Sequence, residues 1–124
     1  RINLIKNNSF NPSFDIANMI NIFYDQCVKY VKLVFILRIF INTYRLVDLA
    51  LLHKYINKCI DQIKIVEFLY QEIYKLIDYY QIDIDDDTII PFNRNYDYVK
   101  NMEFCFKNIK SSFIKIYFEH SNQH

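Results

Sequence analysis

The chain has 124 residues, enough for one domain with a buried core, and its 15 basic and 14 acidic residues give a net charge of +1. Nucleic-acid-binding domains usually carry an excess of basic residues that neutralises phosphates, and this chain has no such excess. Glycine is absent, which excludes phosphate-binding loops, dinucleotide fingerprints and nucleophile elbows, because these need glycine for positive φ or close backbone approach to a ligand. We therefore expect neither an enzyme nor a cofactor-binding protein.

The composition also bears on the source and compartment of the chain. Its 11 tyrosines and 11 phenylalanines have A/T-rich codons, so they reflect an A/T-rich genome as well as the fold. Three cysteines, an odd number at wide spacing, argue against a disulfide framework and favour a reducing intracellular compartment. Because the sequence starts with Arg1 rather than Met, we expect a processed product or a fragment of a longer protein.

The first predicted helix follows an irregular lead-in over residues 1–11. Asn11 and Pro12 are typical of a helix start, and Asp15 follows near the positive end of the helix dipole. Apolar residues then recur at steps of three and four, which places them on one face of a helix over 13–42. This first stripe consists of Ile16, Ile20, Phe23, Cys27, Tyr30, Val34, Leu37, Ile41 and Tyr44.

A second helix is predicted over 45–80, because the first stripe ends at Asp48 and Asn42-Thr43 offers a cap nearby. A straight helix of this length would span about 50 Å, so the molecule is either elongated or gains a fourth helix where this one breaks. The second stripe consists of Leu49, Leu52, Ile56, Cys59, Ile63, Val66, Tyr70, Ile73, Ile77 and Tyr80.

An irregular acidic connector is predicted over 81–94, where Pro91 follows a run of aspartates. The D-x-D-x-D spacing from Asp83 resembles a calcium loop, but Thr88 and Arg94 replace its essential glycine and glutamate. Asn95 then caps a third helix over 95–119, and 121–124 is a polar tail. The third stripe consists of Val99, Met102, Phe106, Ile109, Phe113 and Ile116. Together these elements predict an all-α bundle in a single domain over 1–124.

The cysteines and histidines do not match a metal-binding motif. Cys27 and Cys59 lie within the stripes and Cys105 beside one, so all three are interpreted as small buried hydrophobes. His53 lies five residues after Asp48, which is the wrong helical offset for a direct pair. No transmembrane span is expected either, because charged residues interrupt the most apolar stretch, 28–52, before it reaches about 20 residues.

Aromatic residues outside the three stripes are the candidate interaction site. They widen the apolar surface beyond one narrow face, and Tyr and Phe are enriched in the cores of protein interfaces. We therefore expect a non-enzymatic protein–protein interaction module or structural subunit that forms a homo-oligomer or joins a larger assembly. The candidate interface residues are Tyr24, Phe35, Phe40, Tyr55, Phe68, Tyr74, Tyr79, Phe104 and Phe118.

Two alternatives remain open at this stage. A small nucleic-acid-binding domain would use Lys100, Lys107 and Lys110, which can share one face of the last helix, although Glu103 lies among them. A helical bundle that holds an apolar ligand or a metal between its helices would need a site that sequence spacing does not reveal.

Overall fold

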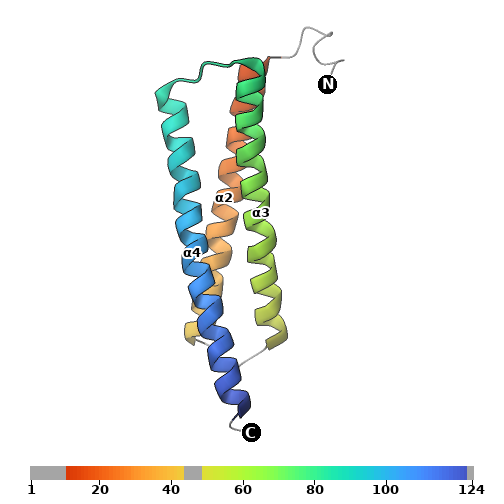
Figure 1. Ribbon diagram of the computed structural model, residues 1–124, viewed down its shortest axis with the longest axis vertical. Helices are drawn as coiled ribbons and strands as arrows, with labels where there is room; N and C mark the ends of the chain where they lie inside the picture. Colours follow the sequence, from red (N-terminus) through yellow and green to blue (C-terminus); the bar gives the residue numbers. More distant parts are fainter. Residues whose placement is uncertain (1–10, 44–48, 123–124) are drawn as a thin grey trace.

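Over the residues that the structure describes, the chain forms an elongated, all-α bundle of three helices that run antiparallel to their neighbours in sequence (Figure 1). The computed structural model describes residues 11–43 and 49–122, and it contains no strand in these ranges. Helix α2 spans Pro12–Thr43, α3 spans Leu49–Tyr80 and α4 spans Asp86–Asn122. The predicted fold class is thereby confirmed. Helix α3 is unbroken over its 32 residues, about 48 Å, so the elongated alternative is correct and no fourth helix arises from it.

The start of α2 and the end of α3 follow known capping patterns. The Asn11 side chain accepts a hydrogen bond from the Phe14 amide at 3.2 Å, as expected for an N-cap residue followed by proline. At the end of α3, Ile82 donates to the Ile77 carbonyl at 3.0 Å and Gln81 donates to that of Asp78 at 3.3 Å. This is a Schellman motif, and Gln81 adopts the required positive φ of 50° in a chain that has no glycine.

Helix α4 begins at Asp86, so the predicted connector over 81–94 and the predicted start at residue 95 are wrong. The Asp85 carboxylate accepts a hydrogen bond from the Thr88 amide at 3.0 Å and acts as the N-cap. The aspartates after it stabilise the first turn through the helix dipole. Pro91 lies inside the helix and removes one backbone hydrogen bond there. The acidic run therefore starts a helix instead of forming a long loop.

The buried apolar core consists of members of the predicted stripes together with one residue from the misassigned segment, Phe92, which is fully buried. The stripe residues Ile41, Tyr70, Ile77 and Tyr80 are only half-buried, and the side chains of Tyr44, Leu49, Ile109, Phe113 and Ile116 lie outside the described residues. Helix α2 packs against both other helices, whereas α3 and α4 contact each other less extensively. Gln62 is buried among these residues and donates hydrogen bonds to the Gln26 side chain at 2.7 Å and to the Gln26 carbonyl at 3.0 Å. The buried apolar residues are Ile16, Ile20, Phe23, Cys27, Tyr30, Val34, Leu37, Leu52, Ile56, Cys59, Ile63, Val66, Ile73, Phe92, Val99, Met102 and Phe106.

Candidate protein interaction surface

The candidate interface aromatics do not form one surface but divide into two groups. One group packs at the edge of the core and thus belongs to the fold: Tyr24, Phe40, Tyr55 and Tyr74. The other group is exposed to solvent: Phe35, Phe68, Tyr79 and Phe104. The side chain of Phe118 lies outside the described residues. Only the exposed group is available for a partner.

A cluster of aromatic rings joins the three helices. The Phe23 ring of α2 lies 4.8 Å from that of Phe92 in α4, and the rings of Tyr70 and Tyr96 stack at 3.7 Å with an angle of 5°. The hydroxyl groups of Tyr70 and Tyr74 both donate to the Asn93 side-chain oxygen, at 2.7 and 2.6 Å. Sequence reasoning missed Phe92 and Asn93 because it assigned both to a loop.

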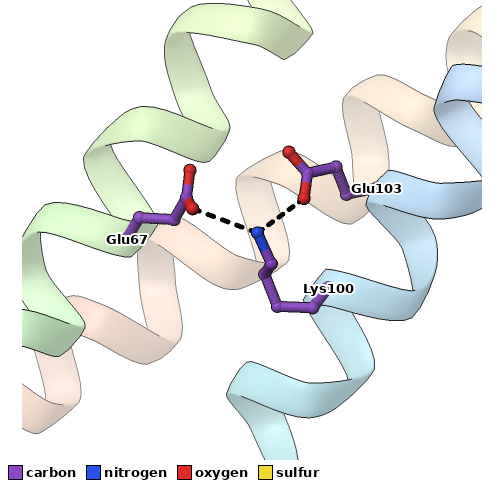
Figure 2. A network of polar contacts seen from close by, with 3 residues as sticks. All are labelled: Glu67, Lys100 and Glu103. Carbon is purple, nitrogen blue, oxygen red and sulfur yellow. Dashed lines mark hydrogen bonds and ion pairs between the residues drawn. The ribbon is translucent and has the colours of Figure 1, made fainter.

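A three-residue ionic network lies further along the contact between α3 and α4 (Figure 2). The Lys100 ammonium group contacts the carboxylates of Glu67 at 3.0 Å and Glu103 at 2.6 Å. Burial alone would lower the pKa of Lys100, but the hydrogen bonds that Lys100 donates to Glu103 and Glu67 outweigh this and raise its pKa. Lys100 is therefore charged and already occupied by two carboxylates of its own chain.

Two exposed phenylalanines flank this network. Phe68 directly follows Glu67 and is 60% exposed, and Phe104 directly follows Glu103 and is 67% exposed. Each also comes two residues after a buried side chain, Val66 or Met102, and is therefore turned about 200° around its helix, away from the core. Phe68 and Phe104 thus lie one on each helix, each next to a glutamate that contacts Lys100. We call these five residues, Glu67, Phe68, Lys100, Glu103 and Phe104, the α3–α4 surface.

The other candidate residues are placed apart from this network. Of the three candidate lysines, Lys100 is paired with Glu67 and Glu103, Lys107 is exposed, and the side chain of Lys110 lies outside the described residues. His53 is exposed on α3, whereas its sequence neighbour Asp48 lies outside the described ranges. Within those ranges, no group of three or more His, Cys, Asp or Glu side chains is arranged to hold a metal ion.

The cysteines differ from one another in exposure. Cys27 and Cys59 are buried as predicted, but Cys105 is exposed, because it lies one residue to the side of the buried Phe106. Burial raises the pKa of the Cys27 thiol to about 12 and that of the Cys59 thiol to about 11, which suppresses the reactive thiolate in both.

We therefore expect one of the three thiols to react rapidly in the folded protein. With an aromatic disulfide reagent at pH 8, Cys105 is expected to react at the rate of a free thiol. Cys27 and Cys59 are expected to react only after unfolding in denaturant. The Cys105→Ser variant should remove the rapid phase. Two or three rapid equivalents in the unmodified chain would contradict the buried positions of the other thiols.

The fold and its surface define an antiparallel helical bundle whose exposed features are aromatic and ionic. None of the helices, over the residues described, is both long enough and apolar enough to cross a membrane. Comparison of the chain with protein-family models, curated proteins and solved structures finds no match. Functional assignment therefore depends on the surface of the chain itself.

Proposed function

We propose that this chain is a non-enzymatic structural subunit that self-associates through the α3–α4 surface, alone or within a larger assembly. The observation that supports this most directly is the exposure of Phe68 and Phe104 on either side of the Lys100 network. Large aromatic side chains are the commonest anchors of protein interfaces. A phenylalanine side chain has no polar atom that could form a hydrogen bond with water, so its exposure is not stabilised by the solvent.

The chemistry of this surface suits a second copy of the same chain. Two apolar anchors lie beside a charged group that is already neutralised within its own chain, so docking would not bury an unpaired ion. Burial of a phenylalanine contributes roughly 1.5–3 kcal/mol, and the exposed part of each ring here accounts for more than half of that. Two such anchors on each copy form the centre of a self-complementary interface.

Sedimentation velocity over a range of concentrations tests this proposal. The unmodified chain is expected to form a dimer or larger oligomer, and the double variant Phe68→Ser/Phe104→Ser should weaken association about 100-fold, which corresponds to about 3 kcal/mol. Phe14→Ser is the matched control, because Phe14 is 62% exposed but lies in the first turn of α2. It should leave association unchanged.

The proposal fails if the unmodified chain is a monodisperse monomer at every concentration. It also fails if both sets of variants change association equally, since that would indicate nonspecific adhesion between apolar side chains. Circular dichroism of each variant checks that the helices remain folded.

A further inference from the structure

The second half of α2 presents a solvent-facing strip that is both apolar and cationic. Four large apolar side chains in it, Val28, Phe35, Ile36 and Ile39, are between 43% and 59% exposed. The exposed lysines Lys29 and Lys32 lie among them. We call these six residues the α2 outer face. It is about 17 Å long, since 11 steps of 1.5 Å separate its ends.

This face has no acidic residue to balance its charge. Residues 26–43 contain three basic residues, Lys29, Lys32 and Arg38, all exposed, and neither Asp nor Glu. The last acidic residue before it on α2 is Asp25. A partner that covers this face must therefore provide negative charge for the lysines and an apolar environment for the four apolar side chains.

The antiparallel fold extends this asymmetry to the whole bundle. The hydrogen bond between Gln26 and Gln62 and the ion pair between Glu67 and Lys100 show which residues of the three helices lie at the same level. Towards the 81–85 connector, residues 12–25 and 63–104 carry 11 acidic and four basic residues, a net charge of −7. Towards the other end, residues 26–43, 49–62 and 105–122 carry eight basic and two acidic residues, a net charge of +6. The overall charge of +1 thus conceals a strongly polarised molecule.

Three kinds of partner can be compared on these observations. A second copy docked face to face would bring Lys29 and Lys32 against the same lysines, which is electrostatically unfavourable. A nucleic acid would neutralise the lysines but leave the four apolar side chains without an apolar environment. An anionic lipid surface supplies both phosphate or carboxylate groups and a hydrocarbon layer into which Phe35 and Ile39 can insert.

We infer that the α2 outer face binds to the surface of an anionic lipid bilayer, with α2 lying in the plane of the interface. Phe35, Ile36 and Ile39 enter the boundary between headgroups and acyl chains. Lys29 and Lys32 extend their ammonium groups to the anionic headgroups while their methylene stems cover apolar surface. The connector aspartates lie at the far end of the bundle, away from the basic half (Figure 1).

This surface is separate from the one proposed for self-association. The α2 outer face points away from α3 and α4, whereas Phe68 and Phe104 point away from the core on the α3–α4 side. Both surfaces can therefore be occupied at once, and either proposal can fail without the other.

Single-tryptophan variants test the inference directly, because the chain contains no tryptophan. With vesicles of phosphatidylcholine containing about 30% phosphatidylserine, emission of Phe35→Trp is expected to shift to shorter wavelength as the ring leaves water. Phe104→Trp, at an exposed position on another helix, should show no shift. Raising the salt from about 0.1 to 1 M should release the protein, since the Debye length falls from about 10 to 3 Å. Vesicles of phosphatidylcholine alone should bind weakly.

A second test compares the vesicle affinities of two double variants that each remove two positive charges, measured by vesicle co-sedimentation. Lys29→Ala/Lys32→Ala should lower vesicle affinity about 25-fold, because each cation near an anionic surface contributes about fivefold. Lys64→Ala/Lys75→Ala removes the same charge from exposed positions on α3 and should lower affinity by less than threefold. Absence of binding to phosphatidylserine vesicles at low salt overturns the inference. The inference is also overturned if the emission of both tryptophan variants shifts equally, or if both pairs of lysine substitutions lower vesicle affinity equally. Binding of duplex RNA in place of vesicles would overturn it as well.

Discussion

Replacing Phe23 with alanine is expected to destabilise the folded chain by about 3–5 kcal/mol, which is the usual cost of deleting a buried phenylalanine ring. Phe23 is fully buried, and its ring lies within 6.5 Å of rings from both other helices, namely those of Phe92, Tyr70 and Tyr96. Because a domain of this size is stable by only about 5–15 kcal/mol, the variant is expected to be largely unfolded on warming. Urea titration followed by far-ultraviolet circular dichroism measures the loss.

The matched control for this prediction is Phe14→Ala, at the exposed end of the same helix. It is expected to change stability by less than about 0.5 kcal/mol, since surface substitutions outside special sites have small effects. A Phe23→Ala variant as stable as Phe14→Ala would mean that the three helices do not meet at this ring.

The sequence stripes predicted the core well, because burial in a long helix repeats every three to four residues regardless of what the helix packs against. Phe23, Val34 and Val66 lie where their spacing placed them, and each is fully buried. The same periodicity does not distinguish a helix start from a loop. Asp85 is compatible with both, and only its hydrogen bond to the Thr88 amide shows that α4 begins there.

The candidate surface was less predictable than the core because it depends on contacts between helices. Nothing in the spacing of Glu67 and Lys100, 33 residues apart, indicates that their side chains meet. That meeting follows from the relative register of α3 and α4, and it is what makes the sequence neighbours Phe68 and Phe104 flank one network. Aromatic type alone did not separate Phe104, which is exposed, from Tyr74, which packs against the core.

The charge polarity of the bundle was also invisible in the linear sequence. Acidic and basic residues are interspersed along the chain, and their overall balance indicates no charged partner. Folding three helices back on one another brings the acidic stretch over 83–87 beside the acidic start of α2, at the same end of the bundle. The polarity therefore arises from topology and not from composition.

The stability of the bundle is expected to fall steeply above pH 9, because two buried thiols resist ionisation in the folded state. Burial raises the pKa of Cys27 from its ordinary value of 9.0 to about 12, and that of Cys59 to about 11. Below pH 9 both thiols are protonated in the folded and unfolded chains, so they add no pH dependence. Between pH 9 and 11 the unfolded chain loses these protons while the folded chain retains them.

The two thiols together are therefore expected to remove roughly 5 kcal/mol of stability by pH 11. Burial also raises the pKa of Tyr30, whose ring is fully buried, and this adds to the loss above pH 10. The free energy of unfolding, measured by urea titration at pH 8, 9, 10 and 11, should show this slope.

Two variants test whether the loss of stability with rising pH comes from the two thiols and Tyr30 or from general charge repulsion at alkaline pH. Cys27→Ala/Cys59→Ala should be less stable at pH 8 because of the cavities it creates, but it should lose less stability between pH 9 and 10 than the unmodified chain does. Tyr30→Phe should be at least as stable as the unmodified chain at pH 7, since the Tyr30 hydroxyl has no hydrogen-bond partner among the described residues. An unchanged slope in the double cysteine variant would show that the thiols are accessible to water. The stripes that contain Cys27 and Cys59 would then not form a dry core.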